Sequence, residues 1–470
     1  MLDGTTMNSP PPPHNSPDAP ESPAHLLHAR THQVQIVLTV LGIALMLLWC
    51  WFWLHTLRTG RLALAEHLRI PAWSFLGFDF LHNYWAVRLW VSGGNPYLDA
   101  FGDWRGKYAY PPVVLLLYLW SALFSRGVAV VLWMGYISAA MTAAVWIAGR
   151  TRSVLGLMRL PLVLMLGLML WSMPVLFATE RGQGDAICLL LILVAALAYQ
   201  RPKSWAADAV IGACIALAAW VKVYPAVLIL GLLAMRAWRP FALSILMAAL
   251  IGIIPYRATM QFVTASMAAQ QDRVGFLSEV YQWLFHPSQH RPAQLTLYPT
   301  IGVDSHSLTT YWGSFWTYTE AASLQRMPGV IGAAIILGPP TLWLSVRMLR
   351  ASDRARAALA FPYLLWLAAM ATFIMPVSYD YNLFYLPLAA LAVCDRRDPL
   401  IVGLALIALV AWCQPFKVPV PNASDLLFFL KLFSLLGIGV SLLARGRELD
   451  RATLSDAGNA ERLSTIAAAA

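Results

Sequence analysis

The chain has 470 residues, of which 59% are hydrophobic and 12% charged, and its formal net charge is +10. Soluble domains are about 25% charged, so this composition argues against a large soluble all-α protein. The Lys and Arg residues stand in short clusters between apolar runs, which is typical of cytoplasmic loops and not of a nucleic-acid-binding face. The five Cys show no CxxC or Cys/His spacing, so neither a zinc site nor a disulfide framework is predicted.

The chain begins and ends with polar segments. Residues 1–32 are rich in Pro, Ser and His and are predicted to form a disordered cytoplasmic tail, which is unlike a cleavable signal peptide. Residues 445–470 are polar and then Ala-rich, and we predict a second cytoplasmic tail there. The region between them, 33–444, is predicted to be a single transmembrane domain.

The apolar runs between these tails predict membrane helices. The run from Val34 to Leu54 holds about 20 residues without a charge, enough to cross a hydrocarbon core of about 30 Å. The candidate segments are 34–56, 109–124, 127–149, 160–178, 185–200, 205–222, 224–236, 240–258, 328–346, 357–376, 382–394, 399–414 and 425–444. Several are short for a bilayer. The predicted fold class is an all-α polytopic membrane protein with about 11–13 membrane helices.

Two long stretches do not resemble membrane spans. The first, 57–108, has Phe78, Leu81, Trp85 and Leu89 at helical spacing, which predicts a short helix lying on the membrane surface. The second, 259–327, is rich in Tyr, Trp, Gln, Ser and His, too polar to face lipid and too aromatic for a plain linker. We expect a first outer loop at 57–108 and a large outer loop at 259–327.

Basic clusters orient the chain across the membrane. Those expected in the cytoplasm are Arg201/Lys203, Arg236/Arg239, Arg347/Arg350/Arg354/Arg356, Arg396/Arg397 and Arg445/Arg447/Arg451. The polar segments 180–185, 222–225, 259–327 and 378–382 then gather on the outer side, with 57–108. Two full crossings between 109 and 149 would also put Arg150, Arg152 and Arg159 outside. Either one early segment does not span, or this cluster breaks the rule.

Several polar residues on the outer side could carry chemistry, and each has a plainer alternative. Asp79 lies among aromatic residues and could act as a general base, or it could cap a helix. Arg181 could bind a phosphate in a bidentate manner, or the segment Glu180–Asp185 could be a polar turn in which Asp185 caps the next helix.

Lys222 lies at the end of an apolar helix on the outer side, against the charge rule. It could pair with a phosphate or extend to the interface. The segment Ser378–Asn382 could bind sugar hydroxyls, pair with Lys222 or form an ordinary turn.

Motifs for nucleotides are missing from the sequence. There is no Walker A loop, no dinucleotide fingerprint and no Asp-x-Asp pair that would hold a metal and a nucleotide-sugar. A nucleotide-driven transporter and a nucleotide-sugar enzyme are therefore both poorly supported, and no metal or other cofactor is predicted.

A set of short motifs in order resembles glycosyltransferase family 87 of the GT-C superfamily, whose members include polyprenol-phosphate-mannose-dependent α-1,2-mannosyltransferases. The matching pieces, within about 75–390, are Asp79 with Tyr84, Gly94-Asn95-Pro96-Tyr97, Tyr110-Pro111-Pro112, Gly182-Gln183-Gly184-Asp185, Lys222-Val223-Tyr224-Pro225, Arg236-Ala237-Trp238-Arg239 and Ser305-His306-Ser307-Leu308. The resemblance implies a GT-C-type helical bundle with surface helices in the first outer loop.

The resemblance also implies a mechanism. A sugar (mannose or another hexose or pentose) would pass with inversion, and without a metal, from a polyprenyl-phosphate donor to a lipid or glycan acceptor on the outer, periplasmic face of the plasma (inner) membrane of the cell envelope. Asp79 would be the general base, and Lys222, Arg181 and His82 would bind the donor phosphate. The residues expected to bind the sugar or the acceptor are Tyr84, Tyr110, Gln183, Asp185, Tyr224, His306, Asp380 and Asn382.

Two other classes of function remain open. A transporter or flippase for a lipid-linked sugar would show inverted repeats and charged residues near mid-helix, and the sequence shows neither. A non-catalytic assembly partner is the third possibility. Membrane lipids are expected partners in every case, and nucleic acid is not.

Overall fold

The computed structural model describes residues 23–59, 76–101, 108, 110–157, 160–271, 326–374, 380–393 and 423–469. Every regular element assigned in these ranges is a helix, which confirms the predicted all-α class. The predicted segment 399–414 and most of the predicted loop 259–327 lie outside the described residues.

Within the described part of the chain, five helices are long and apolar enough to cross a membrane. They are α1 (Pro23–Thr59), α5 (Arg126–Val154), α15 (Arg326–Arg350), α16 (Asp353–Ile374) and α19 (Ala423–Ala469). Two helix pairs pass the same test as bent units, α6 (Leu162–Leu170) with α7 (Met173–Arg181), bent by 62°, and α11 (Trp238–Ile253) with α12 (Tyr256–Gln271), bent by 85°. The chain is therefore a multi-pass membrane protein.

Shorter apolar helices complete the bundle. They are α4 (Pro112–Tyr118) with the 3₁₀ turn η1 (Leu119–Leu123), α8 (Asp185–Tyr199), α9 (Trp205–Val221), η2 (Tyr224–Ala226) with α10 (Val227–Ala234), and η4 (Asp380–Phe384) with α17 (Tyr385–Val393). Helix α1 begins at Pro23, inside the predicted N-terminal tail, and α19 continues as helix through the predicted C-terminal tail.

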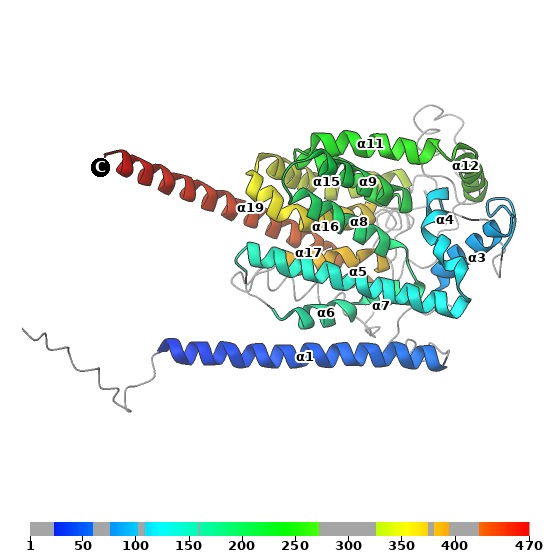
Figure 1. Cartoon of the computed structure of the whole chain (residues 1–470), viewed down its shortest axis with the longest axis horizontal. Coiled ribbons are helices and arrows are strands. Elements are labelled where there is room, and N and C mark those ends of the chain that lie inside the picture. Colours follow the sequence, from blue (N-terminus) through cyan, green and yellow to red (C-terminus); the bar gives the residue numbers. More distant parts are fainter. Residues whose placement is uncertain are drawn as a thin grey trace, which may run out of the picture.

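The bundle has two distinct ends (Figure 1). One end, here called the loop end, carries α3 (Phe78–Val91), α4 and α12. The opposite end, here called the tail end, carries the start of α1 and the close of α19. Helix α5 runs from the loop end at Arg126 to the tail end at Val154.

The length of α4 and η1 bears on the early crossings. The two elements have seven and five residues, about 20 Å in all at the usual rise per residue, whereas a hydrocarbon core is about 30 Å thick. They therefore fall short of a full crossing. The alternative in which one early segment does not span is favoured, because α5 alone then carries the chain across to Arg150 and Arg152.

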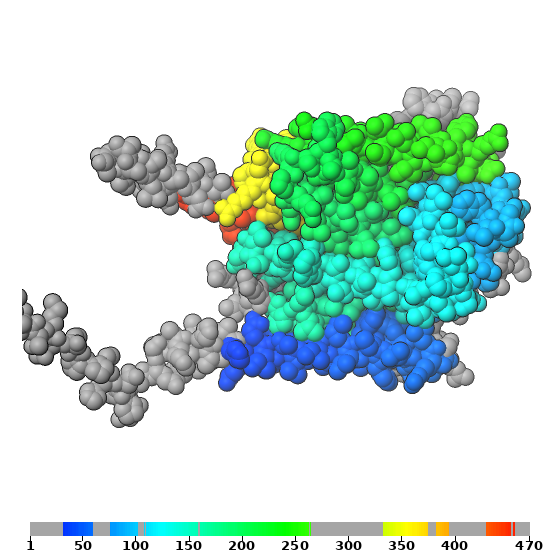
Figure 2. Space-filling model, viewed as in Figure 1, coloured from blue at the N-terminus to red at the C-terminus, as the bar shows by residue number. Residues whose placement is uncertain are grey.

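Helix α16 forms the centre of the bundle, since 89% of its most apolar 18-residue stretch is buried inside the protein. The indole Nε1 of Trp366 donates to the Leu435 carbonyl of α19 at 2.7 Å, which ties the two helices together. Helix α1 lies along one side of the molecule (Figure 2) and packs on α6. A Cβ added at Gly42 would lie 2.5 Å from the Leu164 backbone nitrogen, so glycine allows this close approach.

Helix α3 lies at the loop end, but the predicted apolar face is only partly correct. Leu81 is fully buried in protein, and the buried side also contains Phe80, Tyr84 and Val87. The ring of Phe80 stacks on Trp133 of α5, with centroids 5.4 Å apart. Aromatic packing against the bundle thus competes with the lipid surface for this helix.

Candidate active site

The start of α3 is fixed against the end of α7. Gly77 precedes α3 with φ +77°, and its N–H donates to the Glu180 carbonyl at 2.7 Å. Gly182 follows α7 with φ +69°, and a Cβ there would lie 2.7 Å from the Cβ of Phe80. This close approach brings the first turn of α3 onto the turn between α7 and α8.

Asp79 faces the side chains of that turn. Arg181 donates from Nε to Oδ2 at 2.7 Å and from Nη2 to Oδ1 at 2.9 Å, and Gln183 Nε2 also donates to Oδ2. Gly77 is the N-cap of α3 and no side chain caps the helix. The alternative in which Asp79 caps the helix is therefore wrong, and its carboxylate joins a tertiary network.

Burial raises the pKa of the Asp79 carboxyl above its usual 3.8, while the Arg181 guanidinium opposes the shift. The cause is the loss of water around the charged form, and it exceeds the effect of the ion pair. A carboxylate with a raised pKa is a stronger base, which suits proton abstraction near neutral pH.

Lys222 lies where α9 ends. It is the C-cap, with extended backbone at φ −142°, and Pro225 follows in η2. Its Nζ donates to Gln183 Oε1 at 3.2 Å and lies 3.4 Å from Asp185 Oδ2. The Tyr110 ring centroid is 5.7 Å from the same nitrogen. Lys222 thus points into the protein and not toward the interface.

Lys222 is next to a buried polar group formed by Asp185, Tyr224 and Tyr385. Asp185 is the first residue of α8, is fully buried, and accepts a hydrogen bond from the Tyr224 hydroxyl. The Tyr224 and Tyr385 hydroxyls are 3.0 Å apart, and Tyr385 also donates to the Asp185 carbonyl at 3.3 Å. Asp185 is preceded by the N-cap Gly184, so it is not the cap itself. Because Asp185 is buried beside Lys222, it can hold that side chain in position.

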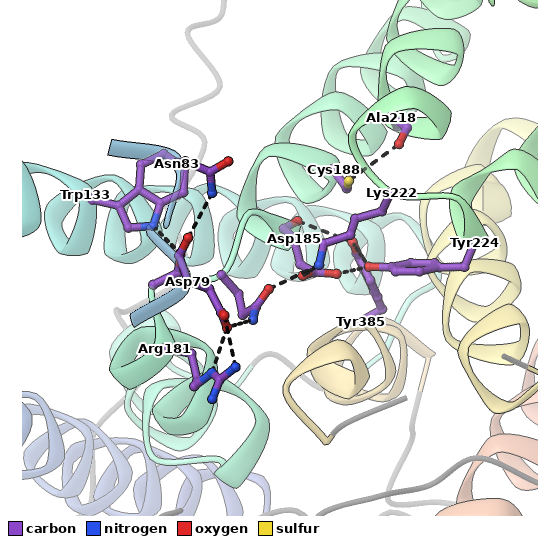
Figure 3. A network of polar contacts seen from close by, with 12 residues as sticks. Asp79, Asn83, Trp133, Arg181, Asp185, Cys188, Ala218, Lys222, Tyr224 and Tyr385 are labelled. Carbon is purple, nitrogen blue, oxygen red and sulfur yellow. Dashed lines mark hydrogen bonds and ion pairs between the residues drawn. The ribbon is translucent and has the colours of Figure 1, made fainter. Parts of the chain in front are cut away.

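The polar contacts form one continuous network (Figure 3). It runs from Arg181 and Asp79 through Gln183 to Lys222, and then through Asp185 to Tyr224 and Tyr385. Five separate segments contribute: α3, the α7–α8 turn, the end of α9, η2 and α17. Two acids and two cations are thereby paired in a largely apolar protein.

His82 lies in an aromatic cage beside this network. Its ring is 5.3 Å from Phe101, 5.4 Å from Tyr108 and 5.8 Å from Tyr110, centroid to centroid. Burial lowers the pKa of His82 to about 4, because the apolar surroundings disfavour the charged imidazolium. The side chain is neutral at pH 7, so it would act on a phosphate as a neutral hydrogen-bond donor.

The remaining predicted site residues make other contacts than those of the network or lie outside the described residues. The hydroxyl of Tyr84 donates to the Phe124 carbonyl at 3.2 Å, so Tyr84 does not join the network. Asn382 is buried in η4, which packs on α7. His306 and the side chain of Asp380 lie outside the described residues.

An apolar cavity of about 610 Å³ opens at the loop end close to the network. It lies between the end of α3, the turn after it, α4 and the α11–α12 bend; its wall includes Trp90, Tyr97, Pro112, Leu116, Ile254 and Ala258. The Tyr97 hydroxyl donates to the Tyr110 carbonyl at 3.0 Å, and the Tyr110 ring lies against Lys222. Two adjoining tyrosines therefore separate the cavity from the ammonium.

The sequence interpretation missed one network residue, Tyr385, and one residue that anchors the turn beside the network, Trp133. Tyr385 stands one helical turn after Asn382, and that spacing was the available signal. Trp133 donates from Nε1 to the Gly182 carbonyl at 3.0 Å and gave no signal within its apolar run. Among the described residues, no group of three or more His, Cys, Asp or Glu side chains could hold a metal ion.

The comparisons agree with the resemblance found in the motifs. The sequence profile of Glycosyltransferase family 87 matches residues 108–376. Arg181, Gln183 and Lys222 lie inside the matched segment, whereas Asp79 precedes it and Tyr385 follows it. Curated proteins and solved structures give no match. Because the matched segment is more than half of the chain, this protein belongs to glycosyltransferase family 87 and is a membrane glycosyltransferase, which uses a sugar donor and an acceptor.

Proposed function

We propose that this enzyme moves a sugar from a polyprenyl-phosphate donor to a lipid or glycan acceptor, with inversion and without a metal, at the loop end of the bundle. Asp79 takes the proton of the acceptor hydroxyl as its oxygen bonds to the anomeric carbon. The bond from that carbon to the phosphate oxygen breaks, and the phosphate leaves with the electron pair. Lys222 and Arg181 stabilise the negative charge of the leaving phosphate.

The observation that carries this proposal is the position of Gln183 between Asp79 and Lys222. One side chain contacts both the proposed base and the proposed phosphate-binding cation. A displacement at a sugar carbon needs a base for the incoming oxygen and a positive charge for the outgoing one. Both groups are available here, joined by the one side chain of Gln183.

The apolar cavity supports a lipid-linked donor. Leu116 and Ile254 on its wall are exposed, as expected for side chains that meet hydrocarbon. A lipid phosphate whose chain lay in the cavity would bring its charged group past Tyr97 and Tyr110 to Lys222. A nucleotide-sugar has no apolar chain to fill this space.

The network suggests which residues reach the substrate. Gln183 joins Asp79 to Lys222. Tyr110, whose ring lies beside Lys222, and neutral His82, next to Tyr110, are proposed to contact the sugar or phosphate. Asp185 and Tyr224 are proposed to hold Lys222 in place. Tyr84, His306, Asp380 and Asn382 remain candidates for acceptor binding.

The proposed orientation puts the loop end on the outer, periplasmic face of the plasma membrane. Arg152 donates to the Leu391 carbonyl at the end of α17, and Asp450 of α19 accepts from the Ser352 N–H. These contacts gather the basic segments around Arg152, Arg350 and Arg445 at the tail end. The positive-inside rule then favours a cytoplasmic tail end.

The test is transfer by purified protein in liposomes. Radiolabelled polyprenyl-phospho-mannose and labelled nucleotide-mannose would be supplied separately, with lipid extract from a strain lacking the gene as the acceptor source. We expect a new labelled glycolipid from the polyprenyl donor alone, and other polyprenyl-phospho-sugars would be tried in parallel. Product from the nucleotide-sugar alone would overturn the proposed donor. Movement of intact donor across the bilayer without product would identify a flippase.

A further inference from the structure

Gln183 is buried and makes two side-chain contacts of opposite polarity. Its Nε2 donates to Asp79 Oδ2, and its Oε1 accepts from Lys222 Nζ at 3.2 Å. A flipped amide would turn its oxygen toward the carboxylate and its N–H groups toward the ammonium. Both contacts would then be repulsive, so the orientation of the amide is fixed by its neighbours.

The backbone that carries Gln183 is fixed as well. Its N–H donates to the Ala178 carbonyl at 3.0 Å, and the Gly182 N–H donates to the Thr179 carbonyl at 3.2 Å. These two bonds close the end of α7. The Trp133 indole holds the Gly182 carbonyl at 3.0 Å. The side chain of Gln183 therefore extends from a well-anchored turn.

The two oxygens of Asp79 are occupied unequally. Among the described residues, Oδ2 accepts from Arg181 Nε and from Gln183, whereas Oδ1 accepts from Arg181 Nη2 alone. Each carboxylate oxygen offers about two acceptor positions. Oδ2 is thus filled and Oδ1 keeps one position for a further donor.

We propose that Gln183 is a positioning residue that fills Oδ2 of Asp79 and holds Lys222, so that Oδ1 alone receives the acceptor proton. This inference rests on the proposed function, because it specifies which oxygen of the proposed base receives the proton. One open position on the base selects one approach for the acceptor hydroxyl.

Loss of the amide would open a second position on the base. A water molecule at Oδ2 could then give its proton to Asp79 while its oxygen bonds to the anomeric carbon and the sugar–phosphate bond breaks. Free sugar and lipid phosphate would be the products. Gln183 thus favours transfer over hydrolysis of the donor.

The experiment compares Gln183→Leu with the wild type in liposomes given radiolabelled polyprenyl-phospho-mannose, with and without the lipid extract. Both the glycolipid and the free labelled sugar are measured. We expect transfer kcat to fall by about 10- to 100-fold, donor KM to stay within about threefold, and the ratio of free sugar to glycolipid to rise at least about fivefold. Gln200→Leu, the same substitution at the far end of α8, is the matched control and should change neither ratio nor rate.

The pH profile gives a second readout that a purely structural role would not move. The groups facing Asp79 are Arg181, Lys222, Asp185 and Tyr110, with Gln183. A hydrogen bond to the ionised carboxylate lowers its pKa, so removal of that bond raises the pKa. The acid limb of kcat/KM in Gln183→Leu should therefore move to higher pH.

Other outcomes overturn the inference. A fall in transfer with an unchanged product ratio and an unchanged acid limb would show a structural role only, and full activity would show no role. If Gln183→Leu does not fold, Gln183→Glu keeps an oxygen for Lys222 and puts a like charge beside Oδ2. A folded Gln183→Glu without a higher acid limb contradicts the inference. If instead Asp79→Asn stays active, the proposed base itself is wrong, which separates the two failures.

Discussion

Arg152 and Arg356 at the tail end are as well buried as the charged residues of the loop end, but they bind different partners. Arg152 donates to the Leu391 carbonyl at 3.0 Å. Arg356 donates to the Leu349 and Ala351 carbonyls, and its carboxylate partner among the described residues, Asp353, is exposed at the surface. At the loop end, Asp79, Arg181, Gln183 and Lys222 contact one another through their side chains.

The difference separates structural from chemical use of a buried charge. An arginine that satisfies the last carbonyls of a helix completes a backbone that would otherwise leave acceptors unpaired. Side chains that pair with one another leave their charges available to a ligand that exchanges with them. The contrast predicts that substitutions at the loop end reduce activity and those at the tail end reduce stability.

Among changes that keep the base, the largest effect is expected at Lys222. Lys222→Met should lower kcat/KM for the polyprenyl donor by about 100-fold, because the leaving phosphate loses its cation. The measurement is initial transfer rate against donor concentration. Arg239→Met, which removes an exposed cation near Asp208, is the control and should keep wild-type kinetics. Equal rates for Lys222→Met and Arg239→Met would remove Lys222 from the site.

A smaller loss is expected when the α3 contact is disturbed. Gly182→Ala would put a Cβ 2.7 Å from that of Phe80 and strain a backbone at φ +69°, which should move Asp79 and reduce transfer by about tenfold. Gly156→Ala shares the backbone strain at φ +65° but has nothing within 4 Å. The Gly156 variant should lose some thermal stability and keep its specific activity. If both variants behave alike, steric contact with α3 is not what matters.

The pH profile should show one acid limb and no histidine step. Activity requires ionised Asp79, so kcat/KM falls as pH drops through its pKa, and burial places that limb above 3.8. His82, whose pKa burial lowers to about 4, stays neutral across the working range. His82→Asn should cost no more than about threefold in kcat/KM and leave the limb in place. Loss of a limb between pH 5 and 8 in that variant would show that His82 titrates during catalysis.

The smallest effect on activity is expected at the tail end. Arg152→Met leaves the Leu391 carbonyl without this donor, which should destabilise the fold by about 1–3 kcal/mol. Thermal unfolding in detergent would report a lower Tm, while the transfer rate per folded molecule stays unchanged. A loss of turnover in folded Arg152→Met would break the contrast between the two ends.

Sequence patterns predicted the helical elements more fully than the site. Long uncharged runs identify helices such as α5 and α16 because a bilayer demands length and apolarity alone. The short unit α4–η1 falls in the segment 109–124, which the sequence predicts as a membrane segment. Composition does not show that the helix changes to 3₁₀ geometry after Tyr118.

The site depends on contacts between segments that lie far apart in the chain. Motif order identified Asp79, Arg181, Gln183 and Lys222 as separate pieces. It could not show that Gln183 joins Asp79 to Lys222, or that Asp185 and Tyr224 lie beneath Lys222, because those contacts follow from how α3, α8 and α9 meet. The sequence could not show the role of Tyr385 for the same reason, because the packing of α17 brings Tyr385 to the network.

The most direct test of the account is sugar transfer by Asp79→Asn beside the wild type, at equal amounts of folded protein in liposomes. Asparagine keeps the size of the side chain and cannot accept the acceptor proton as a carboxylate does. The account predicts a loss of at least about 1,000-fold in labelled glycolipid, with an unchanged elution profile in detergent. Undiminished product from Asp79→Asn would contradict it.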